Sequence, residues 1–195
     1  MSAAVLLVRH TAVAQQWRGR CYGRSDIGLS RAGAAHARAV ATHVAAWGPS
    51  MVVHSGLKRA RILADHVARH CGLRSIALPA WQERDFGDWE GQSWAAIYRA
   101  TGAAMDGMID APASFRPGGG ETTDDLAIRA MAALDALPAG RIAVVTHGGP
   151  IAAIVGQSKG LPVPDWLSIT PTLGELTMVE RDWRNRARAA RPEMV

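Results

Sequence analysis

Two histidines in this sequence stand where buried strands are expected to end. The apolar run Ala3–Val8 is followed at once by Arg9 and His10, and the run Arg141–Thr146 is followed by His147. In open α/β sheets, ligands bind in the crevice beyond the carboxyl ends of the strands. We therefore expect the two histidines to meet at that edge of a sheet and to form one site.

The residue types at this edge predict phosphoryl transfer. A neutral imidazole nitrogen is a competent nucleophile near pH 7 and can divide a hydrolysis into two displacements, which is the role that we expect for His10. Planar guanidinium groups match phosphate oxygens, so Arg9 and Arg59 are candidate phosphate ligands, and His147 could share that task. Arg59 follows the short apolar run Met51–His54 and would lie on the first turns of a helix at the same edge.

This chemistry also needs an acid to protonate the leaving oxygen. We take Glu83 as the candidate, because the bulky apolar residues of the segment Trp81–Gly91 would favour its protonated form. Its neighbours Asp85, Asp88 and Glu90 are competitors on chemistry alone.

Alternating strand and helix patterns must position these groups. After the long loop Thr11–Leu29, Ser30 is a suitable N-cap for a helix, and the strand Met51–His54 follows. A second helix ends at Gly72, and Ser75–Leu78 has the pattern of a third strand. This βαβαβ order predicts a three-layer α/β/α fold with a mostly parallel central sheet.

The second half of the chain is less regular. Ser93–Thr101 could form a short helix, whereas the glycines and prolines of Met105–Gly120 suggest a mobile loop. Thr122 or Thr123 is expected to cap the next helix, and a small helix is expected beyond Pro150. The last strand, near residues 175–180, follows a connection too short for a crossover helix, which predicts an antiparallel strand at one edge of the sheet.

Composition and charge limit the class of protein. The 195 residues suit one compact domain, and no apolar run approaches the roughly 20 residues that span a bilayer. Two cysteines provide neither a disulfide framework nor a zinc site, and no signal-peptide pattern is present, so we expect free thiols and a cytoplasmic location. The net charge is +5, and five arginines against two acidic residues in the last fifteen positions supply +3 of it. We expect a domain over residues 1–180 and a basic tail over residues 181–195.

Six short motifs occur in order along nearly the whole chain. They are Leu7-Val8-Arg9-His10, Cys21-Tyr22-Gly23-Arg24-Ser25-Asp26, Ser55-Gly56-Leu57-Lys58-Arg59-Ala60, Glu83 with Phe86-Gly87-Asp88-Trp89-Glu90-Gly91, Gly119-Gly120-Glu121-Thr122, and Thr146-His147-Gly148-Gly149. Each motif is weak alone, but together they resemble the histidine phosphatase superfamily, whose fold is that of phosphoglycerate mutase. The resemblance is closest to the branch that contains α-ribazole phosphatase and small phosphoglycerate-mutase-like phosphatases.

The resemblance implies a role for each matched residue. His10 corresponds to the phosphorylated nucleophile and Glu83 to the proton donor. The phosphate pocket is matched by Arg9, Arg59, His147 and Gly148. The resemblance also implies catalysis without a metal or another cofactor. Where the family commonly has Arg-His-Gly-Glu, this chain has Thr11 and Ala12 after the histidine.

We therefore expect a phosphomonoesterase that hydrolyses a small phosphorylated metabolite, such as α-ribazole phosphate, through a phosphohistidine. Tyr22 and Arg24 could shape its substrate pocket or merely fix the long loop. A phosphoglycerate mutase is the alternative among enzymes, and a non-catalytic phospholigand-binding or polyanion-binding protein is the alternative of another class. We expect no specific nucleic-acid partner and no membrane partner, and an exposed edge strand or helix face could support a homodimer.

Overall fold

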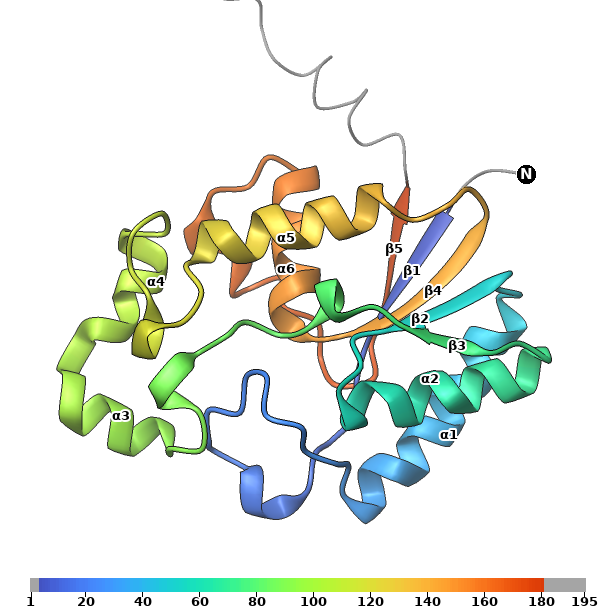
Figure 1. Cartoon of the computed structure of the whole chain (residues 1–195), viewed down its shortest axis with the longest axis horizontal. Coiled ribbons are helices and arrows are strands. Elements are labelled where there is room, and N and C mark those ends of the chain that lie inside the picture. Colours follow the sequence, from blue (N-terminus) through green and yellow to red (C-terminus); the bar gives the residue numbers. More distant parts are fainter. Residues whose placement is uncertain (1–3, 181–195) are drawn as a thin grey trace, which may run out of the picture.

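Five strands form one sheet at the centre of the molecule (Figure 1). A computed structural model describes residues 4–180, so the expected tail at residues 181–195 lies outside the described part. The strands are β1 (Ala4–Arg9), β2 (Met51–His54), β3 (Ser75–Ala77), β4 (Arg141–Thr146) and β5 (Leu176–Glu180), in the spatial order β3-β2-β4-β1-β5. Neighbours among β1 to β4 pair in parallel, whereas β5 pairs antiparallel with β1 at the edge. The predicted sheet and its antiparallel edge strand are confirmed.

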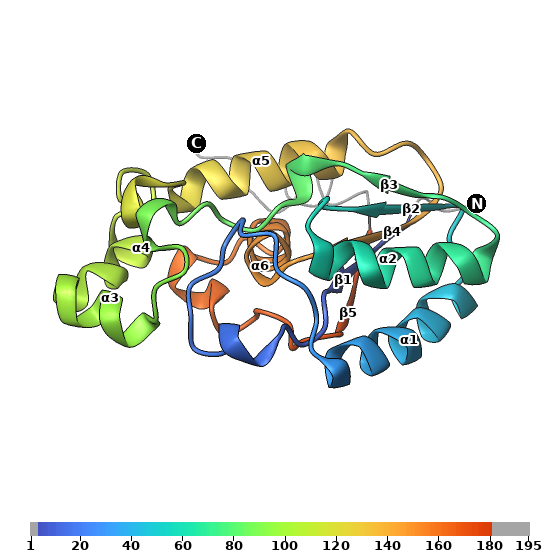
Figure 2. The ribbon, with the colours of Figure 1, turned by 60° about the horizontal axis from the view of Figure 1, so that its bottom comes forward.

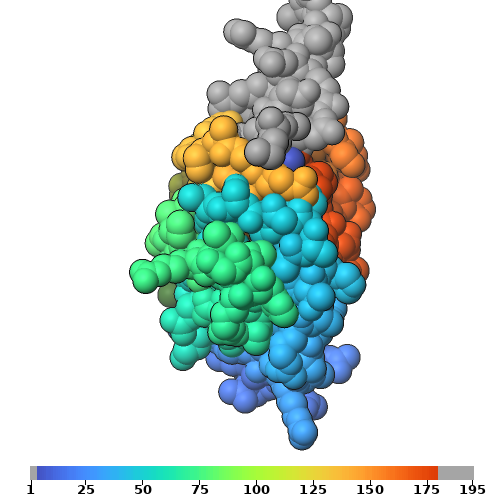
Figure 3. Space-filling view, turned by 90° about the vertical axis from the view of Figure 1, so that its right-hand side faces the viewer, coloured from blue at the N-terminus to red at the C-terminus, as the bar shows by residue number. Residues whose placement is uncertain are grey.

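Helices cover both faces of this sheet, as the three-layer prediction requires (Figures 1 and 2). On one face, α1 (Arg31–Ala46) and α2 (Lys58–Cys71) pack on Leu6 and Val8 of β1; their outer surface, coloured blue to green, forms much of the view in Figure 3. On the other face, α5 (Thr123–Asp135) and α6 (Gly148–Ser158) pack on Val5 and Leu7. Successive strand residues point to opposite faces, so β1, β2 and β4 each supply residues to both cores. None of the helices between residues 4 and 180 combines the length and the apolar content needed to cross a membrane.

Local sequence signals explain where these helices begin and end. The Ser30 hydroxyl accepts a hydrogen bond from the Gly33 amide at 2.9 Å and caps α1. Gly72 ends α2 in the left-handed region, with a φ of 66°. Of the two threonines proposed to cap α5, Thr122 is the N-cap, and it forms a reciprocal capping box with Asp125.

Two expectations for the second half need correction. The segment 105–120 is not one loop: after α3 (Trp94–Thr101), a 3-10 turn leads into the helix α4 (Gly107–Asp110), and a further turn follows at Pro117–Gly119. A helix of four residues is too short to show a periodic apolar face, which is why its sequence pattern is uninformative. The helix α6 begins at Gly148 rather than beyond Pro150; the proline lies in the first turn, where its missing N–H is not needed.

Candidate active site

The two strand-end histidines lie side by side. Because β1 and β4 are paired in register, with Arg9 opposite Thr146, His10 and His147 follow at the same level. The His10 amide continues the ladder by donating to the Thr146 carbonyl at 3.0 Å. The two imidazole centroids are 5.2 Å apart, and both side chains are buried. The expected convergence of the histidines is therefore present.

The surroundings of His10 define which of its ring nitrogens is free. Its Nδ1 lies 2.8 Å from the Thr11 carbonyl oxygen, which can only accept, so Nδ1 carries the proton and Nε2 keeps its lone pair. Burial, assisted by the charges of Arg59 and Arg9, lowers the pKa of His10 from 6.5 to about 3. Near pH 7 the ring is neutral, and Nε2 is available as a nucleophile.

In His147 the ring nitrogen with a hydrogen-bond partner is Nε2, whereas in His10 it is Nδ1. Its Nε2 lies 2.8 Å from the Ser55 hydroxyl, which also receives a long hydrogen bond, 3.4 Å, from the Leu57 amide. If the hydroxyl accepts from that amide and donates to Nε2, the proton of His147 lies on Nδ1, which is buried without a partner among residues 4–180. Burial first, and then the charge of Arg59, hold the pKa of His147 well below its usual value.

Two arginines surround the histidine pair. Arg59, at the start of α2, is fully buried and donates to the carbonyl oxygens of Ser25 at 2.7 Å and of Gly23 at 2.5 Å. Arg9 donates through Nη1 to the Pro171 carbonyl at 2.6 Å. The Nε groups of both arginines are buried without a partner in the described part of the chain. Neither guanidinium forms an ion pair with a described carboxylate, so both positive charges are available to an anion.

The N-terminus of α6 adds to this positive environment. An ideal Cβ atom on Gly148 would lie only 3.2 Å from Arg9 Cζ and 3.0 Å from Thr170 Cγ2. The absence of a side chain therefore lets the Arg9 guanidinium pack against the first turn of the helix. Free amides and the helix dipole at such a turn favour a bound anion.

Glu83 lies at the same helix terminus. Its carboxylate accepts hydrogen bonds from the Arg84 amide at 2.9 Å and from the Gly149 amide at 3.3 Å. Backbone amides as well as the apolar surroundings therefore hold the Glu83 side chain in place. Among its competitors, Glu90 accepts from the Arg24 amide and from the Ser25 hydroxyl, and so fixes the long loop.

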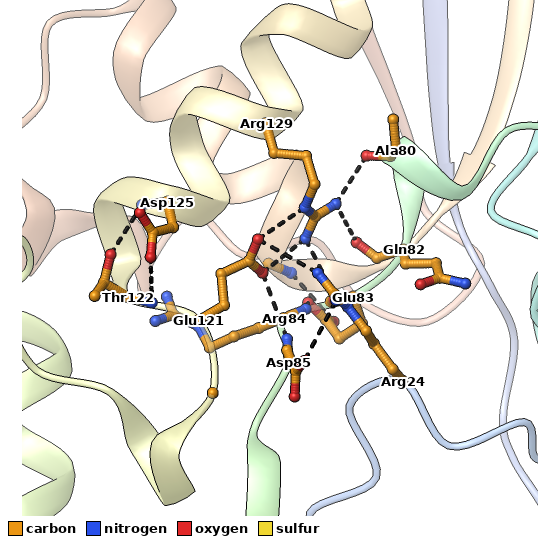
Figure 4. Close-up of polar contacts among 12 residues, drawn as sticks. Arg24, Ala80, Gln82, Glu83, Arg84, Asp85, Glu121, Thr122, Asp125 and Arg129 are labelled. Carbon is orange, nitrogen blue, oxygen red and sulfur yellow. Dashed lines mark hydrogen bonds and ion pairs between the residues drawn. The ribbon is translucent and has the colours of Figure 1, made fainter.

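A polar network fixes the backbone around Glu83 (Figure 4). Arg129 of α5 donates to the carbonyl oxygens of Ala80 and Gln82 at 2.8 and 2.9 Å, and more weakly to that of Glu83 at 3.3 Å. Its guanidinium also forms a bidentate pair with Glu121. The segment that carries the candidate acid is thus attached to a core helix.

The two expected pocket residues, Tyr22 and Arg24, lie in different environments. The ring centroid of Tyr22 is 6.5 Å from that of His10 and 5.1 Å from Arg59 Cζ, and Tyr22 lines a cavity next to the histidines. Arg24 is absent from the residues that line this cavity, and its guanidinium pairs with Asp85 and Glu121. Its position is that of a loop-fixing residue.

The cavity has a volume of about 500 Å³. Arg9, Glu83, Gly148 and Tyr22 lie in its wall. His10 and Arg59 are buried beside Tyr22, and His147 is buried beside His10. Among residues 4–180, no group of three or more His, Cys, Asp or Glu side chains is arranged to hold a metal ion.

Sequence reasoning missed several residues of the site. Ser55 was part of a motif but had no assigned role, and Arg129 had no motif at all. His54 is also buried, and its Nδ1 accepts a hydrogen bond from the Gly56 amide at 3.0 Å. Its position at the end of β2 was the available signal.

Comparison with known proteins shows the family of this chain. The family model of the histidine phosphatase superfamily (branch 1) matches residues 5–190, so the chain belongs to this superfamily. The chain is 32% identical over 162 residues to probable phosphoglycerate mutase GpmB of Photorhabdus laumondii, a match that covers 81% of this chain and 75% of that protein.

Solved structures show the same fold. The native structure of mycobacterial glucosyl-3-phosphoglycerate phosphatase has a TM-score of 0.80 and 27% identity, and the match covers 91% of this chain and 90% of that one. The α-ribazole phosphatase of Shigella flexneri has a TM-score of 0.79 over 91% of this chain and 90% of its own, but at 20% identity it is evidence for the fold alone.

Proposed function

We propose that this protein is a phosphomonoesterase that acts through a phosphohistidine on His10. The observation that carries the proposal is the set of three buried, unpartnered nitrogens around this residue, on Arg9, Arg59 and His147. A buried donor without a partner is costly, and a tetrahedral anion would satisfy all three at once. The free Nε2 of His10 would then face the phosphorus atom of the bound group.

The chemistry follows in two displacements. Nε2 of His10 attacks phosphorus, the bond to the leaving oxygen breaks, and Glu83 gives that oxygen a proton. Water then attacks the phosphohistidine, Glu83 takes up the proton of the water, and inorganic phosphate leaves. The guanidinium groups of Arg9 and Arg59 neutralise the charge of the transferring group, so we propose that the reaction needs no metal ion.

Trapping of the intermediate tests this proposal. Brief incubation with a ³²P-labelled slow substrate, followed by denaturation, should leave label on the protein that is labile to acid and stable to base, and equally so in EDTA. His10→Ala should abolish both label and turnover while its circular dichroism spectrum is unchanged. Label that persists in the folded His10→Ala protein would contradict the proposal.

A phosphoglycerate mutase is the second candidate, because the relative from Photorhabdus laumondii bears that name. A mutase must keep the phosphoryl group and reorient a bisphosphate, whereas a phosphatase admits water. We favour hydrolysis and expect release of phosphate without any requirement for 2,3-bisphosphoglycerate. Interconversion of 2- and 3-phosphoglycerate that depends on this bisphosphate would favour the mutase.

The substrate is proposed only as a small phosphorylated metabolite. α-Ribazole phosphate is the compound that we would test first, within a screen of phosphorylated metabolites. A homodimer and a cytoplasmic location stay predictions from the sequence.

A further inference from the structure

The cavity beside the histidines has two apolar walls. One wall is formed by Phe86, Trp94, Met105, Met108 and Ile109, from the segment that contains α3 and α4. The other is formed by Leu126, Ala152, Val163, Trp166 and Leu167, from α5, α6 and the turn after it. Figures 1 and 2 show α3 and α4 at the end of the molecule away from the sheet, so this segment extends the site beyond the phosphate-binding edge.

Besides Arg9 and Glu83, the charged residues of the lining are Arg20, Arg84 and Asp106, and the apolar residues outnumber them. Arg84 is the charged residue next to the candidate acid; its Nη1 donates to the Thr123 hydroxyl at 2.9 Å, and its Cζ lies 6.0 Å from the Phe86 ring centroid. Within residues 4–180, Arg84 forms no ion pair. Apolar walls with a few placed donors are typical of sites that bind a ring system and orient it by one or two hydrogen bonds.

The size and chemistry of the cavity fit a particular leaving group. A three-carbon hydroxy acid or an amino acid would leave much of the 500 Å³ unfilled and much of the apolar lining in contact with water. A flat ring system would instead remove both walls from water. Glu83 and Gly148 line the same cavity as these walls. A leaving group bound between the walls would therefore lie next to a phosphate held at the histidines.

We propose that the substrate is the phosphomonoester of a bulky, ring-bearing alcohol, whose ring lies between these two walls while Arg84 donates to an acceptor on it. This inference rests on the proposed function, because it assigns the leaving group of the same reaction. It disfavours small polyol, hydroxy-acid and amino-acid phosphates as the preferred substrates.

Two substrates with the same kind of leaving oxygen test the inference. Both 2-naphthylmethyl phosphate and glycerol 3-phosphate release a primary alcohol, so their intrinsic reactivity is similar. The ratio of their kcat/KM values therefore measures how well each leaving group fits the cavity. We expect kcat/KM for the naphthylmethyl ester to be about 100-fold higher, as burial of an apolar ring of that size supports. Equal or lower values, with both esters hydrolysed and His10 labelled, would overturn the inference and leave the proposed function standing. Absence of both hydrolysis and label would overturn the proposed function, and with it this inference.

A matched pair of variants locates the effect. Leu167 lines the cavity and is 75% exposed, whereas Ile128 lies on α5 outside it and is 67% exposed, so replacing either with asparagine opens no buried void. Leu167→Asn should lower the ratio of the two kcat/KM values by roughly 5-fold, because one apolar contact with the ring is lost. Ile128→Asn should leave the ratio unchanged. An equal change in both variants, or no change in Leu167→Asn, would show that the ring binds elsewhere and would overturn the inference.

Discussion

Arg129 and Glu121 form a bidentate ion pair, with Nε to Oε1 and Nη2 to Oε2 both at 2.8 Å. Both side chains are mostly buried, and the same guanidinium also binds three backbone carbonyls of the segment that ends at Glu83. One side chain on α5 thus determines where the candidate acid lies relative to the histidines.

We expect Arg129→Lys to destabilise the protein and to slow turnover. Lysine keeps the charge but cannot reach the carboxylate and the carbonyls with one planar group, so some buried acceptors lose their donors. The loss should be about 2 kcal/mol of unfolding free energy, measured by urea denaturation, together with a lower kcat. Arg116→Lys is the control, because the Arg116–Asp125 pair is exposed and such pairs contribute about 0–1 kcal/mol. Equal effects of the two substitutions would contradict this role for Arg129.

The buried histidines predict how stability depends on pH. Above about pH 6.5, His10 and His147 are neutral in both the folded and the unfolded chain, so they do not lower stability there. Below that pH the unfolded chain binds protons on these histidines and the folded protein does not. The cause is burial, which lowers the pKa of both residues in the folded protein, that of His10 to about 3. His10 should therefore remove about 1.4 kcal/mol of unfolding free energy per pH unit between pH 6.5 and 3, and His147 should act in the same direction below pH 6.5.

Urea denaturation at several pH values measures this slope. His10→Gln should reduce the slope by the share of one histidine, whereas replacement of the exposed His43 of α1 by glutamine should not alter it. If the wild type and both variants lose stability equally as the pH falls, burial of His10 is not the cause.

Ser55→Ala should impair catalysis more than stability. The hydroxyl is the partner of His147 Nε2, and without it the imidazole can rotate or change its tautomer. We expect kcat/KM to fall about 10-fold for a loss of ~1 kcal/mol in unfolding free energy. Ser168→Ala removes an exposed hydroxyl that donates to the Asp165 backbone carbonyl and should leave kcat/KM as in the wild type. An unchanged kcat/KM in Ser55→Ala would mean that His147 is held by other contacts.

Gly148→Ala should weaken phosphate binding. The new methyl group would lie against Arg9 Cζ and Thr170 Cγ2, and the guanidinium would have to move away from the helix terminus. Inorganic phosphate should then inhibit about 10-fold less strongly, because placement of the charged group is altered. Gly28→Ala is the matched control, since nothing lies within 4 Å of a methyl group there. Equal inhibition constants for the two variants would contradict the proposed packing.

The sequence predicted those parts of the molecule that depend on local signals. Strand ends, the N-cap at Ser30 and the glycine at position 72 are each defined by a few neighbouring residues, and they were found correctly. The pairing of His10 with His147 was also predictable, because the carboxyl ends of parallel strands meet at one edge.

The supporting contacts could not be predicted in the same way. Ser55 meets His147 across 92 positions of sequence, and Arg129 binds carbonyl groups that carry no side-chain signal. The cavity is made by short segments whose apolar residues have no common period, so only their packing reveals that they face one space.

The attachment of Arg9 to distant parts of the chain has a consequence for biosynthesis. Its carbonyl accepts from the Gly174 amide, its guanidinium donates to Pro171, and the next residue, His10, hydrogen bonds to Thr146. The first strand is translated well before residues 146–174, which supply the groups that orient its carboxyl end. We therefore expect a nascent chain to gain activity only after residue 174 has emerged and these contacts have formed.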